Sequence, residues 1–301
     1  MTIVMPKLSL TSRIVCLVGL FACGIASAQS QPAGKFYIVG MGAAPDLITV
    51  RAQNVIARAD VLIGEKNEFD HEWAAYAKGK QVWELPHHFR RFYGIDPKAL
   101  PDPEQRAQAE KVDTARRQFM ERIRTALAAG KVVASLQGGD PMMYGMTLFL
   151  EMLPPGTPTE IVPGVGAFQA ASAALKHSPP YGYDTSAVIL TMHDWQGRAD
   201  ENEKLMAAGS TMVFYTMGLD YPLLFAQLRR FYPPQTPVAV VCDAGDPEAQ
   251  RIVMSTVGRF LEEIDPKTLP PERHMLFVGK FLTAGQARKD FLARLPPSMH
   301  E

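Results

Sequence analysis

The stretch SLQGGDPMMYGMTLFLEML, residues 135–153, constrains the fold of this chain more than any other. The apolar run before it, residues 132–136, predicts a buried strand that ends in a turn at Gly138, Gly139 and Asp140. Pro141 is well placed to begin a helix of Met, Tyr and Leu residues. Because glycine has no Cβ, a ligand can approach such a turn closely. In open α/β sheets, ligands bind where strands end in turns of this kind. The same residues also form a good chain reversal, so other stretches must decide between these interpretations.

From residue 35 onward, the chain alternates short apolar runs with helical patterns. Strands are predicted over residues 36–42, 60–64 and 81–85. Helices are predicted over residues 47–59, with Asp46 as the N-cap, and over residues 103–129. Strands separated by helices in this order predict a parallel, doubly wound sheet. The run LPPGTP, residues 153–158, then predicts a linker to a second domain.

The chain beyond the predicted linker has more strands and fewer helices. After a strand and a small-residue helix within residues 160–175, strands are expected over residues 186–194, 210–218, 238–245, 251–258 and 274–282. The clearest helix among them covers residues 221–232. This pattern predicts a mixed α+β domain. The expected fold class is therefore α/β with an N-terminal domain over residues 35–153, a C-terminal domain over 159–285 and a peripheral tail over 286–301.

The first 28 residues have the three-part pattern of a secretory signal peptide. Lys7 and Arg13 precede an apolar run, residues 14–25, that is too short to span a bilayer comfortably. Small residues then lead to a predicted cleavage site near Ala28, which implies a periplasmic or secreted protein without a membrane span after leader removal. A lipid anchor on Cys23, an uncleaved anchor and a misassigned start are the alternatives.

Charge and cysteine content argue against several classes of site. The 31 basic and 31 acidic residues give a formal charge of zero, so the sequence does not suggest a broad basic surface for nucleic acid. After leader removal only Cys242 remains, which excludes an internal disulfide, and no zinc-type cysteine spacing is present. We therefore predict neither a metal site nor a nucleic-acid partner.

Six stretches of the sequence, taken together, resemble the tetrapyrrole (corrin/porphyrin) methylase family, whose members bind S-adenosylmethionine. In order they are GMGAAPDLITVRAQNVIARADVLIG, GKVVASLQGGDPMMYGM, EIVPGVGAFQAASAAL, TMVFYTMG and TPVAVVCDAGDPEAQRIVMSTV, followed by HMLFVGKFL. The resemblance covers residues 35–282 and is nearest to the precorrin and uroporphyrinogen-III C-methyltransferases. It implies a two-domain homodimer that holds the methyl donor between its domains. One departure is Ala43-Ala44-Pro45, where the family usually has a proline and a glycine.

The resemblance also implies which residues form the donor site. Its matched positions are Gly40, Gly42, Gly138, Gly139, Asp140, Met143, Gly166, Ala167, Met217, Ala244 and Gly245. Asp140 and Glu65 follow predicted strand ends, so either carboxylate is a candidate to accept the proton that leaves after methyl transfer. Without the family, Met143 and Met217 would be interpreted as packing residues. Asp140 and Glu65 could instead be turn and cap residues, an alternative that is favoured for Glu65.

The loop PHHFRRFYG, residues 86–94, is the candidate acceptor site. Arginine side chains bind carboxylates in pairs and aromatic faces stack on flat rings, and a tetrapyrrole presents both groups. We therefore predict substrate contacts from His87, His88, Arg90 and Arg91. A solvated basic loop is the alternative. A metal site is disfavoured because adjacent histidines on a strand point to opposite faces.

The predicted function is direct methyl transfer from S-adenosylmethionine to a tetrapyrrole-like substrate. Export would separate such an enzyme from its donor, which is made in the cytoplasm. A non-catalytic periplasmic protein that binds a tetrapyrrole or another ligand is therefore one alternative. An enzyme like the peptide N-methyltransferases is another, because RRFY before a long helix is reminiscent of that branch.

Overall fold

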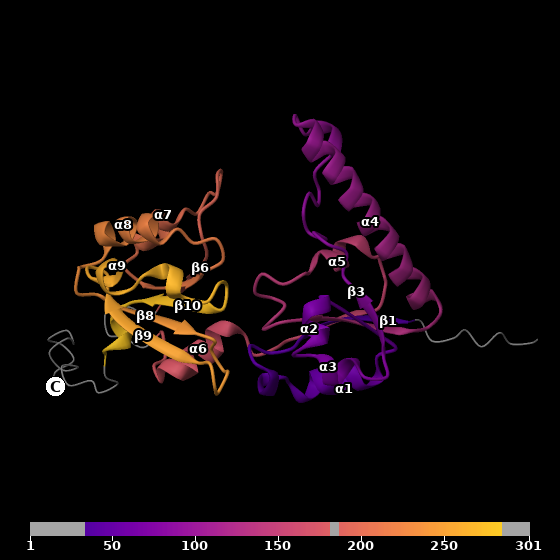
Figure 1. Cartoon of the computed structure of the whole chain (residues 1–301), viewed down its shortest axis with the longest axis horizontal. Coiled ribbons are helices and arrows are strands. Elements are labelled where there is room, and N and C mark those ends of the chain that lie inside the picture. Colours follow the sequence, from indigo (N-terminus) through magenta and orange to yellow (C-terminus); the bar gives the residue numbers. More distant parts are fainter. Residues whose placement is uncertain (1–33, 181–186, 285–301) are drawn as a thin grey trace, which may run out of the picture. The chain divides into compact units, whose positions relative to one another are not determined.

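The computed structural model describes residues 34–180 and 187–284. The predicted leader, its cleavage at Ala28, the anchor at Cys23 and the predicted tail lie outside these residues. Within the described ranges, two five-stranded sheets form the framework (Figure 1). None of the helices there combines the length and apolar character needed to cross a membrane.

The first sheet is entirely parallel, with the strand order β3-β2-β4-β1-β5. Its strands are β1 (Lys35–Gly40), β2 (Val61–Gly64), β3 (Gln81–Glu84), β4 (Val132–Gln137) and β5 (Thr159–Val162). Its helices are α1 (Val50–Arg58), α2 (Lys66–Asp70), α3 (Ala74–Ala77), α4 (Pro103–Ala128) and α5 (Leu148–Met152). The parallel, doubly wound sheet predicted from the sequence is confirmed.

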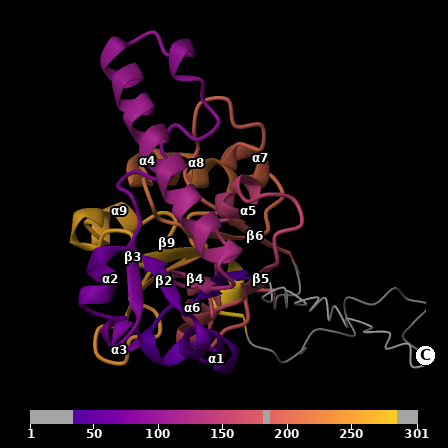
Figure 2. The same ribbon diagram turned by 90° about the vertical axis from the view of Figure 1, so that its right-hand side faces the viewer.

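Both faces of this sheet are covered, which explains why its central strands are continuous apolar runs. Along β1, Phe36 and Ile38 pack against α4 and α5, whereas Tyr37 and Val39 pack against α1. Figure 2 shows α4 and α5 on one side of the strands and α1 and α3 on the other. The helices thus fix the sheet on both faces and leave the carboxyl ends of its strands to the connecting loops.

The strand β5 corrects one predicted boundary. We assigned residues from 159 onward to the second domain, but β5 pairs in parallel with β1, with Phe36 opposite Thr159. The Pro-rich run before it forms a turn, in which the Thr157 amide donates to the Pro154 carbonyl oxygen over 3.1 Å, and this turn leads the chain to the open edge of β1. The first sheet therefore extends beyond the predicted linker. The division into two domains stays a prediction.

The first helix is capped by a different residue from the one we predicted. Asp46 lies in a short 3₁₀ turn, η1 (Pro45–Leu47), and α1 begins only at Val50. The Thr49 hydroxyl accepts a hydrogen bond from the Ala52 amide over 3.1 Å. Pro45 favours the start of the short turn, so the helix starts one turn later than its apolar pattern suggests.

Replacing Thr49 with alanine should therefore lower the free energy of unfolding by about 1 kcal/mol, because α1 loses its N-cap. Asp46→Ala is the matched control. Since Asp46 is exposed and outside the helix, its loss should change stability by less than about 0.5 kcal/mol. Urea titrations of both variants make the comparison, and an equal loss in the two would contradict this assignment of the cap.

The second sheet has the order β6-β7-β10-β8-β9 and contains both parallel and antiparallel pairs, a pairing that the predicted mixed α+β domain did not specify. Only β6 (Val188–Thr191) and β7 (Thr211–Tyr215) pair in parallel; β8 (Pro237–Cys242), β9 (Arg251–Thr256) and β10 (His274–Val278) are antiparallel to their neighbours. Phe214, Val240 and Leu276 pack beneath α8 (Tyr221–Phe231) and α9 (Phe260–Glu263). The other face packs against α6 (Ala167–Leu175). Short elements complete the chain: α7 (Asn202–Met206), η2 (Pro97–Ala99), η3 (Pro266–Thr268) and η4 (Lys280–Leu282).

Candidate functional site

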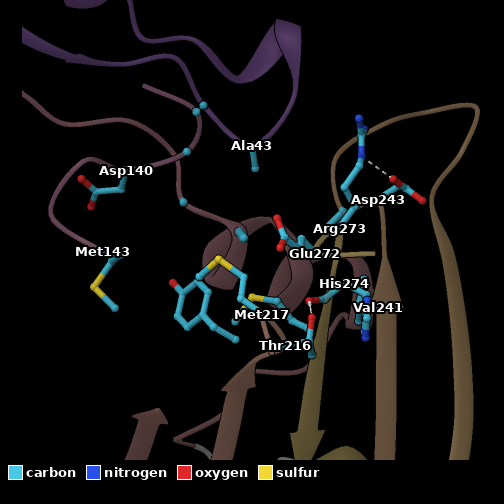
Figure 3. A pocket seen from close by; sticks show the side chains of 18 of the residues that line it. Ala43, Asp140, Met143, Thr216, Met217, Val241, Asp243, Glu272, Arg273 and His274 are labelled. Carbon is cyan, nitrogen blue, oxygen red and sulfur yellow. Dashed lines mark hydrogen bonds and ion pairs between the residues drawn. The ribbon is translucent and has the colours of Figure 1, made fainter. Parts of the chain in front are cut away.

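A cavity of about 780 Å³ lies among the loops at the ends of strands from both sheets. Its volume is within the range of sites that hold a cofactor-sized molecule. Figure 3 shows Asp140 and Met143 on one side of it and Asp243, Arg273 and His274 on the other. The loop after β1, helix α2 and the N-terminus of α6 supply further lining residues.

Nine of the eleven predicted donor-site positions line this cavity. They are Gly42, Gly138, Gly139, Asp140, Met143, Gly166, Ala167, Met217 and Ala244. The other two glycines pack the surrounding loops together. A Cβ on Gly40 would lie 2.5 Å from the Gly164 nitrogen, and one on Gly245 would lie 2.7 Å from a methyl carbon of Leu47. The structure brings the predicted positions together, and their contact with a donor stays a prediction.

Main-chain hydrogen bonds join the glycine loops into one surface. Gly42 and Gly139 form an antiparallel bridge, in which the Gly139 amide donates to the Gly42 carbonyl oxygen over 2.8 Å. The Ala43 amide donates to the Val165 carbonyl oxygen over 2.8 Å. Gly139 has a φ of +67°, which favours glycine. These loops follow β1, β4 and β5, so the ends of three adjacent strands hold this side of the cavity in place.

The helix that we predicted to begin at Pro141 is not formed there. Residues 141–144 make turns, Tyr144 has a φ of 62°, and α5 begins at Leu148. The Gln137 side chain explains the difference, because its Oε1 accepts from the Met146 amide over 2.6 Å. Asp140 adds a turn by accepting from the Met142 amide over 3.1 Å. The loop therefore brings Met143 into the cavity lining rather than onto a helix.

The opposite side of the cavity carries polar residues that were not predicted from the sequence. Arg273 donates to Asp243 over 2.7 Å and to Glu72 of the loop after α2 over 3.3 Å. Both ring nitrogens of His274 form hydrogen bonds. Nδ1 lies 2.7 Å from the Pro270 carbonyl oxygen, and Nε2 lies 2.6 Å from the Tyr221 hydroxyl oxygen. Burial lowers the pKa of His274, which favours a neutral ring. Polar residues at the ends of predicted strands were the only sequence signal for this side.

Tyr215 contributes a hydroxyl group that has no hydrogen-bond partner among the described residues. This hydroxyl is buried, and Tyr215 also lines the cavity. Burial raises the pKa of Tyr215 to about 12, so the group is neutral and able to donate at ordinary pH. Since orphaned polar groups are rare in folded proteins, this hydroxyl fits a site that receives a polar ligand.

A second, smaller pocket of about 230 Å³ lies at the ends of β2, β3 and β4. It shares Glu68 and Gly138 with the larger cavity. Glu65, predicted as a catalytic candidate, lines only this smaller pocket and precedes α2 as its N-cap. The alternative interpretation of Glu65 as a cap residue thus agrees with the structure. The other catalytic candidate, Asp140, lines only the larger cavity.

The loop of residues 86–94 is held against the body of the protein by its backbone. The buried Arg116 of α4 donates to the carbonyl oxygens of Phe89 and Arg91 over 2.9 and 3.1 Å. Arg90 donates to the Tyr144 carbonyl oxygen over 2.8 Å and lines the smaller pocket. Of the four predicted acceptor residues it alone lines a pocket, although all four are exposed; Arg91, His87 and His88 line neither pocket.

The two histidines of this loop differ from our expectation for adjacent residues on a strand. They occupy a turn, in which His88 has a φ of 59°. Their ring centroids are 3.8 Å apart, so the rings lie together rather than on opposite faces. The argument from strand geometry therefore does not apply to this pair.

Arg116→Met should release this loop. Two carbonyl oxygens would lose their donor, which predicts a loss of about 1–3 kcal/mol in the free energy of unfolding. Arg117→Met is the matched control, because Arg117 pairs with the same Asp113 but its side chain is 69% exposed. Its loss should cost less than about 0.5 kcal/mol. Denaturant titration measures both, and equal effects would mean that Arg116 does not hold the loop.

Comparisons with known proteins place these features in a family. The family model for Tetrapyrrole (Corrin/Porphyrin) Methylases matches residues 35–260. The chain is 29% identical to a cobalt-precorrin-4 C(11)-methyltransferase of Priestia megaterium, over 87% of this chain and 93% of the relative. It is 27% identical to a siroheme synthase of Hydrogenovibrio crunogenus over 84% of its own length, but it spans only 50% of that protein. The chain thus covers about half of the siroheme synthases that it matches.

Solved structures share the fold. A cobalt precorrin-4 methyltransferase superposes with a TM-score of 0.63 at 23% identity, covering 83% of this chain and 96% of the other. A uroporphyrin-III C-methyl transferase from Thermus thermophilus, complexed with S-adenosylhomocysteine, gives a TM-score of 0.57 at 21% identity, over 83% and 99% of the two chains. The two-sheet architecture is therefore one that other proteins adopt over nearly their whole length.

Proposed function

This chain belongs to the tetrapyrrole (corrin/porphyrin) methylase family, and on that basis we propose that it transfers a methyl group from S-adenosylmethionine to a tetrapyrrole-like acceptor. One observation carries the proposal: nine matched positions line a single cavity of about 780 Å³, and a second pocket adjoins it. Two pockets with shared walls suit a reaction in which a group passes from one bound molecule to another.

The larger cavity fits the donor. A Cβ at Gly138 would meet no protein atom within 4 Å apart from its chain neighbours, so this part of the wall is open to a ligand. Main-chain groups of residues 138–140 and the side chains of Met143 and Met217 would hold the donor, and the Tyr215 hydroxyl would supply a hydrogen bond. When bound, S-adenosylmethionine supplies an activated sulfonium methyl group. The protein's task is then to position the acceptor atom, which can contribute several kcal/mol.

The smaller pocket and its surroundings fit part of a large acceptor. Arg90 offers a cation at the pocket wall, and Arg91, His87 and His88 lie on the same exposed loop. Tyr144 and Met142 are exposed by 42% and 58%, which provides apolar surface beside the pocket. Carboxylates on a flat ring would meet the cations while the ring covers the apolar side chains. The relatives named for precorrin-4 and uroporphyrinogen III support this acceptor class.

The leader pattern of residues 1–28 supports a further proposal, namely a periplasmic or secreted mature protein. It also favours a second function, in which the cavity holds a tetrapyrrole or another ligand without methyl transfer, because export separates the protein from its donor. We propose a homodimer on the family resemblance alone.

Calorimetric titration of the purified protein with S-adenosylhomocysteine tests the main proposal. We expect a dissociation constant on the order of micromolar. Transfer of labelled methyl from S-adenosylmethionine to uroporphyrinogen III, compared with a candidate peptide, then tests the acceptor class. Absence of binding to either adenosyl compound would contradict the enzyme and leave the ligand-binding function. Transfer to the peptide alone would contradict the tetrapyrrole acceptor.

A further inference from the structure

The two pockets share part of their lining. Only two of the residues that line the larger cavity also line the smaller pocket, Gly138 and Glu68. If the donor occupies the larger cavity and the acceptor the smaller pocket, the methyl group crosses where the two meet. Since Gly138 has no side chain, Glu68 is the ionisable residue that faces both molecules at that place.

The environment of Glu68 suits a carboxyl group that exchanges a proton. It is the third residue of α2, and its Oε2 accepts a hydrogen bond from the Glu65 amide over 3.2 Å. Within residues 34–180 and 187–284, no ion pair neutralises it. Burial, together with the charges of Glu65 and Glu72, raises the pKa of Glu68 to about 7, although the hydrogen bond from the Glu65 amide acts in the opposite direction. The group therefore changes charge near neutral pH.

We propose that Glu68 is a catalytic carboxylate of the methyl transfer, which faces the donor sulfonium and accepts the proton that leaves the methylated acceptor. This inference rests on the proposed function. Glu65 and Asp140 are also lining residues, but Glu65 lines only the smaller pocket and Asp140 lines only the larger cavity. Neither stands where donor and acceptor meet.

The methyl transfer and the proton transfer together conserve atoms and charge. A nucleophilic atom of the acceptor forms a bond to the methyl carbon, and the electron pair of the carbon–sulfur bond stays on sulfur, which becomes a neutral thioether. The acceptor then carries one positive charge. An N–H or C–H proton leaves it for the Glu68 carboxylate, the acceptor is neutral again, and Glu68 returns the proton to water.

Several charged groups lie in the same two pockets or on the same helix as Glu68, and their charges influence its pKa. Glu65 and Glu72 flank it at the two ends of α2, and His71 lines the same cavity. Arg90 lines the smaller pocket with Glu68, while Asp140 and Arg273 line the larger cavity. A sulfonium cation adds a positive charge to this set, which favours the ionised carboxylate and lowers its pKa. Donor binding should then expel a proton from Glu68 at pH values below about 7.

Calorimetry in two buffers with different ionisation enthalpies measures this proton. At pH 6, S-adenosylmethionine should release up to about one proton more than S-adenosylhomocysteine, whose sulfur is neutral, and the excess should disappear near pH 8.5. In Glu68→Gln the excess should be lost, although both compounds still bind. Glutamine can accept the same hydrogen bond from the Glu65 amide, so the start of α2 is preserved.

The matched control is Asp70→Asn, which removes an exposed carboxylate from the same helix outside both pockets and should keep the excess proton. Protons released by His71 or His274 would persist in Glu68→Gln. An equal excess in that variant, or no excess in the unmodified protein, overturns the role of Glu68 and leaves the proposed function standing. If neither adenosyl compound binds the unmodified protein, the proposed function itself fails. With an accepted tetrapyrrole, Glu68→Gln should also slow transfer about 10²–10⁴-fold without weakening S-adenosylhomocysteine binding.

Discussion

Gly138→Trp should abolish donor binding while the protein stays folded. Gly138 lies on the wall shared by the two pockets, and a Cβ placed there would meet no protein atom within 4 Å apart from its chain neighbours. Its φ is outside the positive range that strains other residues, so a larger side chain costs the backbone little. The indole ring would instead occupy space that the ligand needs. We expect S-adenosylhomocysteine to bind at least about 100-fold more weakly, which corresponds to roughly 2.7 kcal/mol.

Calorimetric titration measures the affinity, and a thermal melt followed by circular dichroism verifies the fold. Gly138→Ala is the control, because a single methyl group in open space should leave most of the affinity intact. A substitution at Gly139 would be harder to interpret, since its φ of +67° strains any other residue. Unchanged affinity in Gly138→Trp would show that the donor does not lie against this turn.

The first sheet could be predicted from the sequence because apolar runs separated by helical patterns fit few arrangements other than a parallel sheet. Strands such as VLIG are apolar on both faces, which only a sheet covered on both sides accommodates. The edge strand β5 was misassigned for a physical reason. Its run TEIV follows three prolines and a glycine, which are typical of linkers, and only pairing with β1 places it in the first sheet.

The candidate site was predictable where it depends on glycine and not where it depends on tertiary contacts. The turn at Gly138 and Gly139 stands out because adjacent glycines after a strand let a ligand approach the backbone, and the other matched motifs favour this interpretation over a simple chain reversal. Glu68 does not stand out, since an acidic residue in the first turn of a helix is expected for capping and for the helix dipole. Glu68 is a candidate catalytic residue because it lines two pockets, and the other residues of those pockets come from distant parts of the sequence.

Local hydrogen bonding explains the wrong helix prediction after Pro141. A proline followed by Met, Tyr and Leu favours a helix. Gln137, at the end of β4, instead holds the Met146 amide with its side-chain oxygen, which bends the chain around the pocket. Because this contact joins residues nine apart, no helical periodicity reveals it.

Phe149→Ala is expected to cause the largest loss of stability, about 3–5 kcal/mol in the free energy of unfolding. Phe149 is fully buried on α5, with its ring centroid 5.3 Å from that of Phe36 on β1 and 5.1 Å from that of Phe89 in the candidate acceptor loop. Removing the ring leaves a cavity that these elements cannot easily fill, because α4 and the sheet enclose it. Denaturant titration gives the loss directly.

Leu223→Ala is a suitable control, since Leu223 is an exposed helix residue, and its loss should stay within about 0.5 kcal/mol. The position of Phe149 also predicts a selective effect on ligands. Phe89 anchors residues 86–94, whereas the glycine turns of the larger cavity are joined by their own main-chain hydrogen bonds. Under conditions where Phe149→Ala remains folded, S-adenosylhomocysteine should therefore bind with nearly unchanged affinity while uroporphyrinogen III binds more weakly. Equal weakening of both would show that the two pockets depend on one core rather than on separate supports.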